Sequence, residues 1–329
     1  MTWKGVYSMK NIIAILLLAV VSSACRAQPV DSTLFSESPI TLHTSTGNIY
    51  GTLCEPTKAK HFPVALIIAG SGPTDRDGNS MMLYSDCYKI LAHRLAANNI
   101  ATIRYDKRGI GESRAAMTKE SDLRFDNYID DARAWIDSLK HSGQFTEVIV
   151  IGHSEGSLIG MIAARDADKY VSIAGVGNKA DVVLKHQLAN LPEQNLPEPL
   201  RGTAFAILDS VAAGHLVNDV PPSLGSLFRP SVQPYLISWM KYSPEDEIRK
   251  LYIPVLIIQG TNDIQVDTNE AKLLVAADPR AKLVLIKNMN HIFRIVAGDR
   301  AENLRTYGNP DLPISDELVS AITEFIEAR

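Results

Sequence analysis

The sequence predicts an α/β protein with a mainly parallel eight-stranded sheet and helices on both of its faces. Two observations predict this class. Short apolar runs such as PVALIIA, at residues 63–69, are typical of strands buried on both faces of a parallel sheet. Between these runs lie longer segments with apolar residues at helical spacing. Strands that alternate with helices form right-handed crossovers, so the sheet should be mainly parallel and covered on both faces.

The individual elements follow from the same patterns. Alternating stretches at residues 40–44 and 49–53 flank the turn-forming pair Gly47-Asn48, which predicts a hairpin. Buried strands are then predicted at residues 63–69, 100–105, 148–151, 170–174, 254–259 and 282–286. Helices are predicted at residues 83–97, 125–141, 158–167, 269–277 and 314–328.

The alternation stops between residues 178 and 250. This segment has short helical patches separated by prolines, among them Pro192, Pro197 and Pro221, and it has no strand pattern. Connections in compact domains have a median of about 4–6 residues, so this one is far too long to be a simple loop. We expect residues 178–250 to form a helical cap or lid, inserted into a core domain of residues 28–177 and 251–329.

The N-terminal segment has the pattern of an export signal. Lys10 precedes the apolar run NIIAILLLAVV at residues 11–21, which is shorter than the roughly 20 residues of a membrane-spanning helix. Residues 1–27 are therefore predicted to be a signal peptide that is cleaved before Gln28. The alternative is lipid attachment at Cys25, in a weak lipoprotein box. The protein is expected to be secreted or periplasmic, with no stable membrane span.

The composition argues against a nucleic-acid-binding function. The chain has 329 residues, with 33 Lys and Arg against 37 Asp and Glu, and a formal net charge of −4. A nucleic-acid-binding domain normally has a basic excess or stripe. The three cysteines form no CxxC pair that would indicate zinc. We expect no metal and no organic cofactor, and the sequence leaves the oligomeric state open.

The strongest motif for function is Gly152-His153-Ser154-Glu155-Gly156. It follows the apolar stretch EVIVI and precedes a helical pattern, which is the strand–turn–helix context of a G-x-S-x-G nucleophile elbow. Glycines allow the backbone to approach closely at such a sharp turn, and the turn exposes the serine hydroxyl at the edge of the sheet. Ser154 is therefore the candidate nucleophile.

A serine hydroxyl needs a base, and the base needs a group that orients it. The expected chain order after this elbow is an acid and then a histidine. Asp263 lies just past the predicted strand at residues 254–259, with Asp267 as the runner-up acid. His291 follows the last predicted strand. Because all these positions lie at the carboxyl ends of strands, they should meet at one edge of the sheet.

The reaction also needs two donors for a developing oxyanion. One should be the backbone N–H of Glu155, at the start of the helix that follows the nucleophile. The second should come from the loop GSGPTDRDG at residues 70–78, from the N–H of Ser71 or alternatively of Gly72. The segment RYDKRGIGES at residues 104–113 lacks a nucleotide-binding fingerprint and is interpreted as a structural turn.

These segments together resemble the α/β-hydrolases of the serine esterase and aminopeptidase-like group, which includes secreted bacterial carboxylesterases. The matching segments are GSGPTDRDG, RYDKRGIGES, GHSEG, QGTNDIQV and NMNH, and a stretch of the insertion, LFRPSVQPY, is also similar. The resemblance covers roughly residues 35–329. It implies an α/β-hydrolase fold with Ser154 as nucleophile, Asp263 as acid and His291 as base. The HGGG-type loop of many lipases is missing.

The expected function is hydrolysis of short-chain carboxylic esters through an acyl-enzyme, with a small-molecule ester as substrate. An aminopeptidase would need carboxylates in the cap to hold a free amine, and the candidates are Glu193, Glu198, Asp209 and Asp219. An acyltransferase is a further alternative on the same fold. The alternative from a different class is a catalytically inactive binding protein that kept the fold.

Overall fold

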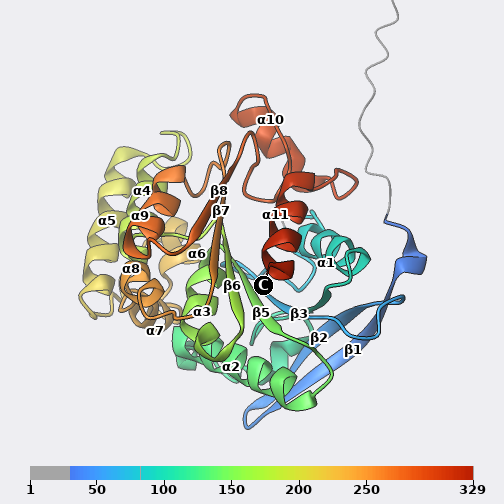
Figure 1. The fold of residues 1–329 in the computed structure, drawn as a ribbon. Helices are drawn as coiled ribbons and strands as arrows, with labels where there is room; N and C mark the ends of the chain where they lie inside the picture. Colours follow the sequence, from blue (N-terminus) through green and yellow to red (C-terminus); the bar gives the residue numbers. More distant parts are fainter. Residues whose placement is uncertain (1–29, 82, 329) are drawn as a thin grey trace, which may run out of the picture.

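A single eight-stranded sheet crosses the molecule in the order β1-β2-β4-β3-β5-β6-β7-β8 (Figure 1). The structure is a computed structural model that describes residues 30–81 and 83–328. The strands are β1 (Phe35–Thr44), β2 (Gly47–Pro56), β3 (Val64–Ile68), β4 (Ala101–Tyr105), β5 (Val148–His153), β6 (Lys169–Ile173), β7 (Val255–Gly260) and β8 (Lys282–Ile286). β2 pairs antiparallel with β1 and with β4, and the other pairs are parallel. The predicted fold class is confirmed.

The hairpin forms as predicted, but its turn lies two residues earlier. Thr44 pairs with Gly47, so Ser45 and Thr46 make the turn and the Gly47-Asn48 pair begins β2. The Thr44 hydroxyl donates to the Gly47 carbonyl and closes this turn. Gly47 has a φ of 141° and packs against the backbone of Ala116, where a Cβ would be too close. Glycine at position 47 is therefore required by the close contact with Ala116 rather than by the turn.

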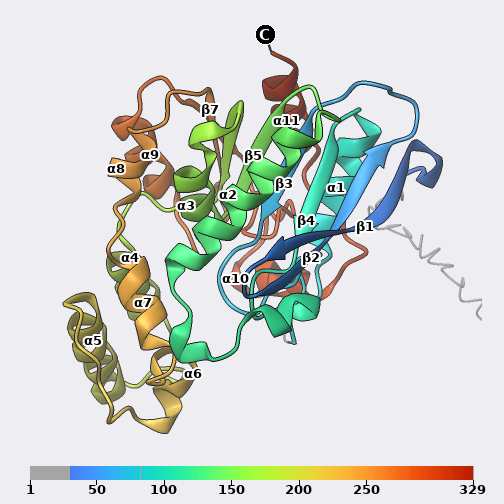
Figure 2. The same cartoon turned by 90° about the horizontal axis from the view of Figure 1, so that it is seen from below.

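Helices cover both faces of the sheet, as the views in Figures 1 and 2 agree. Side chains alternate along each central strand: Ala65 and Ile67 of β3 face one apolar cluster, and Leu66 and Ile68 face the other. The first cluster is covered by α1 (Cys87–Ala97) and α11 (Asp316–Glu327). The second is covered by α2 (Phe125–Ser142), α3 (Glu155–Ala163) and α9 (Thr268–Ala277). The alternation explains why these strands are apolar throughout.

Two predicted helices begin three or four residues away from the expected position. α1 begins at Cys87 rather than residue 83, because the Asn79 side chain accepts hydrogen bonds from the N–H groups of Ser85 and Asp86 and holds that stretch as a loop. α3 begins at Glu155 rather than residue 158 and ends at Ala163. Its early start places a helix N-terminus directly after Ser154.

The segment between β6 and β7 holds helices and, within its described residues, no strand. They are α4 (Ala180–Ala189), α5 (Glu198–Ala212), η5 (Pro222–Leu224), α6 (Gly225–Phe228), α7 (Gln233–Trp239) and α8 (Pro244–Ile248). Figure 2 shows α4 to α7 grouped together on the side away from α1 and α11. α8 packs against α3 and α9 of the core, and Glu247 of α8 pairs with Arg165. The boundaries of a separate cap at residues 178 and 250 stay a prediction.

The remaining elements are short. They are η1 (Ser32–Leu34), η2 (Gly111–Ala116), η3 (Glu120–Asp122), η4 (Ala164–Asp166), α10 (Arg300–Arg305) and η6 (Thr306–Gly308). The predicted signal peptide of residues 1–27, with Cys25, lies outside the described residues. No helix in the described part of the chain is long and apolar enough to cross a membrane.

Candidate active site

The candidate site residues lie in loops at the carboxyl ends of four parallel strands. Ser71 follows β3, Ser154 follows β5, Asp263 follows β7 and His291 follows β8. β3 and β5 are neighbours, and the chain continues from β3 to β4 on one side and reaches β5 on the other. Such a point, where the strand order reverses, is where open α/β sheets form their ligand-binding crevice.

Ser154 has a backbone conformation that side chains rarely adopt. Its φ is 55° and its ψ is −122°, between the last residue of β5 and the first residue of α3. A Cβ on Gly152 would overlap the Gly156 carbonyl, and one on Gly156 would overlap the Ile68 carbonyl. The two glycines therefore allow α3 to pack directly onto β5 and β3. This is the strained strand–turn–helix geometry of a nucleophile elbow.

Asp263 and His291 form a buried, oriented pair. Oδ2 of Asp263 lies 2.7 Å from Nδ1 of His291, and Oδ1 accepts from the N–H groups of Gln265 and Val266 at 2.8 and 3.0 Å. Burial alone would raise the pKa of the Asp263 carboxyl. The charge and hydrogen bond of His291, with the two backbone donors, bring that pKa below its ordinary value. Asp263 is thus a carboxylate that fixes the His291 ring.

The runner-up acid, Asp267, caps a helix instead of bonding to His291. Its side chain accepts from the N–H of Asn269 at 2.7 Å and caps the N-terminus of α9. The hydrogen bonds to the His291 ring therefore involve Asp263, four residues earlier in the chain.

His153, inside the elbow, is bonded on both ring nitrogens. Its Nε2 lies 2.9 Å from the His291 carbonyl oxygen, so Nε2 carries the hydrogen, and Nδ1 accepts from the Tyr88 hydroxyl at 2.7 Å. Burial, and then the charge of His291, hold the pKa of His153 well below its usual value. The neutral ring ties the elbow to the loop of His291 and has no free nitrogen for the nucleophile.

The structure brings the elbow and the histidine loop together but does not bond the two reacting groups. The rings of His153 and His291 contact each other with their centroids 4.6 Å apart and their planes tilted by 50°. Among the hydrogen bonds of the described residues, none joins the Ser154 hydroxyl to the His291 ring. In enzymes without substrate this bond is often long or poorly aligned, and it tightens when the reacting complex forms.

The loop after β3 lies against the elbow. A Cβ on Gly70 would approach the Cβ of Ser154 to 3.1 Å. The N–H groups of Ser71 and Gly72 donate to no acceptor among the described residues, so both alternatives for the second oxyanion donor stay open. Glu155 is the first residue of α3, and its N–H has no partner within the helix.

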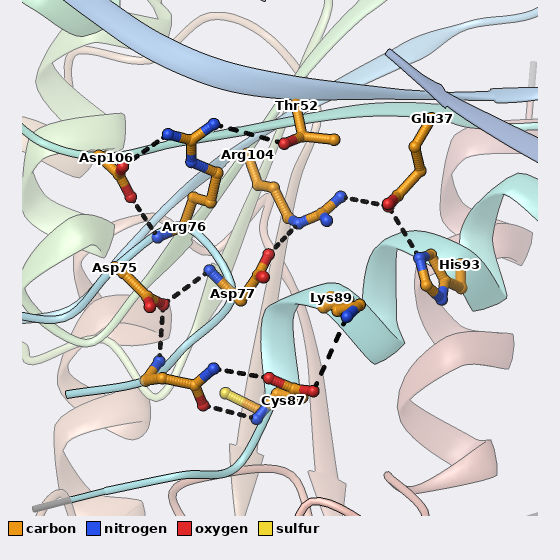
Figure 3. Close-up of polar contacts among 12 residues, drawn as sticks. Glu37, Thr52, Asp75, Arg76, Asp77, Cys87, Lys89, His93, Arg104 and Asp106 are labelled. Atoms are coloured by element: carbon orange, nitrogen blue, oxygen red, sulfur yellow. Dashed lines mark hydrogen bonds and ion pairs between the residues drawn. The ribbon is translucent and has the colours of Figure 1, made fainter. Parts of the chain in front are cut away.

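Ion pairs hold the rest of this loop on the strands beneath it, as Figure 3 shows. The Arg76 guanidinium donates to Asp106 at 2.7 Å, and the Arg76 N–H donates to the same carboxylate at 2.8 Å. Asp77 accepts from Arg104 of β4 at 2.6 Å. Asp106 also accepts from the Glu112 N–H, so the predicted turn at residues 104–113 supports the loop of residues 70–78.

Three residues that sequence reasoning did not place in the site connect its loops. Tyr88 accepts from the Gly70 N–H at 3.0 Å and donates to His153. Lys107 donates to the Gly70 carbonyl at 2.6 Å and to Glu155 at 3.1 Å. Lys107 could have been found because it also follows a buried strand at its carboxyl end, by the rule that places Ser154. Tyr88 had no such signal. His153 lies in the predicted elbow, but its role, like that of Tyr88, depends on contacts with residues far away in the sequence.

A cavity of about 720 Å³ opens beside Ser154, and most of its lining is apolar. Its lining includes Ser71, Ser154 and Glu155 of the site and, from the helices between β6 and β7, Leu184 of α4 and Trp239 of α7. Ligand pockets typically have volumes of about 300–1,000 Å³ with few polar groups. The cavity is thus of a size and character suited to a small, mostly apolar molecule.

The carboxylates that line this cavity are both paired. Glu155 pairs with Lys107, and Glu120 with Arg229. The acids of the insertion named above as amine ligands lie elsewhere: Asp209 pairs with Lys185, and Glu193 and Glu198 both lie beside Arg201. None of the insertion's four candidate acids is among the described residues that line the cavity.

Comparisons with known proteins find similar sequences and similar folds. The model of the family "Serine aminopeptidase, S33" matches residues 80–189. Esterase EstD of Thermotoga maritima is 26% identical over 299 residues, which cover 88% of this chain and 68% of EstD.

Solved structures are similar over most of the chain. Est1E from Butyrivibrio proteoclasticus, with ferulic acid bound, is 18% identical with a TM-score of 0.57, over 88% of this chain and 100% of Est1E. The Pyrococcus furiosus esterase Pf2001 is 14% identical with a TM-score of 0.54, over 90% and 93% of the two chains. At these identities the structures show the shared fold. Together with the sequence matches, they support the resemblance of this chain to the α/β-hydrolases of the esterase and serine aminopeptidase-like group.

Proposed function

We propose that this protein hydrolyses short-chain carboxylic esters through an acyl-enzyme formed on Ser154. The class, a carboxylic ester hydrolase, agrees with the match to EstD over most of both chains. The observation on which the proposal rests is the Asp263–His291 hydrogen bond of 2.7 Å beside the strained elbow of Ser154. A carboxylate, an imidazole and a serine in this order are what activation of a hydroxyl requires.

In the proposed mechanism the His291 ring removes the proton of Ser154 as the hydroxyl attacks the ester carbonyl. Asp263 keeps Nδ1 of the ring protonated, so that Nε2 is the basic nitrogen. His291 then gives the proton to the leaving alcohol. Water then attacks the acyl-enzyme while His291 takes its proton, and His291 returns that proton to the Ser154 oxygen as the carboxylic acid leaves. The scheme uses no metal and no organic cofactor.

The tetrahedral oxyanion would be held by the Glu155 N–H and by the N–H of Ser71, with Gly72 as the alternative. The two loops lie against each other at Gly70 and Ser154, and the Ser71 and Gly72 N–H groups are uncommitted. The N-terminus of α3 adds favourable potential for a negative charge at this place. Removal of one such donor typically lowers kcat about 10²–10³-fold.

The cavity favours an ester over a peptide with a free N-terminus. An aminopeptidase needs an unpaired carboxylate near the scissile bond, and the two acids of the cavity already have cationic partners. We further propose that residues 178–250 act as a cap whose apolar side chains bound the acyl or alcohol group. The small-molecule ester substrate is part of the same proposal.

We also propose that the protein is exported, on the pattern of residues 1–27. Sequencing the N-terminus of the protein from its native cell separates the alternatives, because cleavage by ordinary signal peptidase leaves Gln28 first and lipid attachment leaves Cys25 first.

The substitution Ser154→Ala tests the proposed activity. It should abolish turnover of short p-nitrophenyl esters, lowering kcat by at least about 10³-fold, because the acyl-enzyme cannot form. Ser121→Ala is the matched control, since Ser121 is exposed and lies outside the cavity, and it should turn over these esters at the wild-type rate. Circular dichroism confirms that both variants are folded. Full activity in Ser154→Ala would contradict the proposal.

A further inference from the structure

Lys107 is a buried lysine whose ammonium group contacts two hydrogen-bond acceptors and an aromatic ring. It lies two residues after the end of β4, and its side chain is 2% exposed. Nζ donates to the Gly70 carbonyl at 2.6 Å and to Oε1 of Glu155 at 3.1 Å, and it lies 4.9 Å from the centre of the Tyr128 ring. An ammonium group has three hydrogens, and Lys107 donates two of them to these acceptors, which join two separate loops of the protein.

Stability alone does not explain why the Lys107–Glu155 ion pair is buried. Glu155, its partner, is 3% exposed. Removing two charges from water is expensive, and buried ion pairs can often be replaced by apolar residues of similar volume without loss of stability. The contacts of Lys107 with Gly70 and Glu155 point to a functional reason for the pair.

The first contact bears on the Ser71 N–H. The Gly70 carbonyl and the Ser71 N–H belong to one peptide unit, which is planar and trans, so the two groups point in opposite directions. A bond that fixes the carbonyl toward Lys107 therefore fixes the N–H toward the other side. The Tyr88 hydroxyl accepts from the Gly70 N–H and fixes the preceding peptide unit as well. Gly70 is thus held from both sides, directly beside Ser154.

The second contact bears on the other donor residue. Glu155 supplies the N–H at the start of α3, and its side chain ends on the same ammonium group. One lysine thus joins the peptide unit of Ser71 to the residue that provides the second donor, across the gap between the loop after β3 and the elbow after β5.

We propose that Lys107 is a positioning residue of the oxyanion hole, which sets the direction of the Ser71 N–H and its spacing from the Glu155 N–H. This inference rests on the proposed function. It assigns Ser71 rather than Gly72 as the second donor, because the bond of Lys107 orients the peptide unit that contains the Ser71 N–H. Lys107 acts through Gly70 and Glu155 and does not touch the reacting atoms.

The test is Lys107→Met in the full chain, which replaces the lysine by an unbranched side chain one atom shorter and removes its donors. We expect kcat/KM for p-nitrophenyl butyrate to fall about 10–100-fold, somewhat less than for loss of a whole donor. A trifluoromethyl ketone with the same acyl chain forms a tetrahedral oxyanion on the serine, so its inhibition constant should rise by the same factor. The inhibition constant of the corresponding amide, a substrate-like ligand, should change less than about threefold.

Lys169→Met is the matched control. Lys169 is also buried, and it also donates to backbone carbonyls, those of Ile326 and Ala328, and to a carboxylate, Glu147. It is the first residue of β6 and so lies at the amino end of that strand, whereas the candidate site lies at the carboxyl ends of the strands. This variant should lose stability through the same kind of change while it keeps kcat/KM and both inhibition constants.

Two results with Lys107→Met would overturn the proposal. Unchanged kcat/KM in Lys107→Met, or a loss that appears equally in the amide and the ketone, overturns the proposal, the latter because Lys107 would then bind substrate. If Lys107→Met does not fold, Glu155→Gln replaces it, and a parallel change of about 3–10-fold in kcat/KM and ketone affinity is expected. Unchanged values there overturn the proposal. Failure of the wild-type protein to hydrolyse any ester would instead contradict the proposed function itself.

Discussion

At the scale of single residues, the hydrogen-bond donors around its carboxylate identify Asp263 as the acid that orients His291. Oδ1 accepts from two backbone N–H groups, and Oδ2 faces the His291 ring at 2.7 Å and the Gln259 amide at 3.3 Å. The sequence could predict an acid in this loop from its place after β7. It favours Asp263 over the runner-up, Asp267, but it does not show why, because the difference depends on how residues 263–266 wrap around a carboxylate.

The substitution Asp263→Asn tests this assignment. An amide at this position would leave the His291 ring in the wrong tautomer, and in comparable triads this costs about 10³–10⁴-fold in kcat. Asp267→Asn is the matched control, because asparagine caps a helix as well as aspartate does, and its kcat for p-nitrophenyl esters should stay within about twofold of the wild type. Equal losses in the two variants would contradict the assignment.

At the scale of elements, most strands could be predicted because each is an apolar run bounded by turn residues. The errors lie where a side chain bonds to the backbone a few residues away and so decides a boundary. Asn79 delays the start of α1 to Cys87, and the Thr44 hydroxyl closes the hairpin turn at Ser45 and Thr46. The spacing of apolar residues does not reveal such bonds, because polar side chains make them. The early start of α3 reflects the elbow, whose strain also depends on the packing of Gly156 against Ile68.

At the edge of the sheet lies a partly exposed carboxylate with two basic partners. Glu37 of β1 bonds His93 of α1 and pairs with Arg104 of β4, as Figure 3 shows. Partial burial would raise the pKa of the Glu37 carboxyl, but these two partners lower it to about 2, from an ordinary value of 4.5. The unfolded chain therefore takes up a proton at Glu37 before the folded chain does. The contribution of Glu37 to stability is complete above about pH 5 and is lost as the pH falls toward 2.

The substitution Glu37→Gln should flatten this dependence. Because the group is partly exposed, we expect the free energy of unfolding to fall by about 1 kcal/mol less between pH 6 and pH 3 than in the wild type. Urea unfolding at a series of pH values measures the difference. Glu55→Gln is the control, since Glu55 accepts from the neutral side chain of Gln144 and its variant should follow the wild-type slope. Parallel curves for Glu37→Gln and the wild type would contradict the assignment.

At the scale of the whole molecule, the strand order makes the site. β3 and β5 are neighbours although β4 lies between them in the chain, so the loops of Gly70 and Ser154 meet, and β7 and β8 bring Asp263 and His291 to the same edge. This much could be predicted from a parallel sheet. The shape of the cavity could not, because it depends on how α4 and α7 lie over Ser154, and helical periodicity does not give that placement.

The most direct measurement of the central claim is labelling with a fluorophosphonate, which reacts with serines that a neighbouring base has activated. Digestion and mass spectrometry then locate the adduct. We predict one adduct per chain, on Ser154, and its loss in His291→Ala although Ser154 is still present. An adduct on another serine, or equal labelling of Ser154 without His291, would contradict the account.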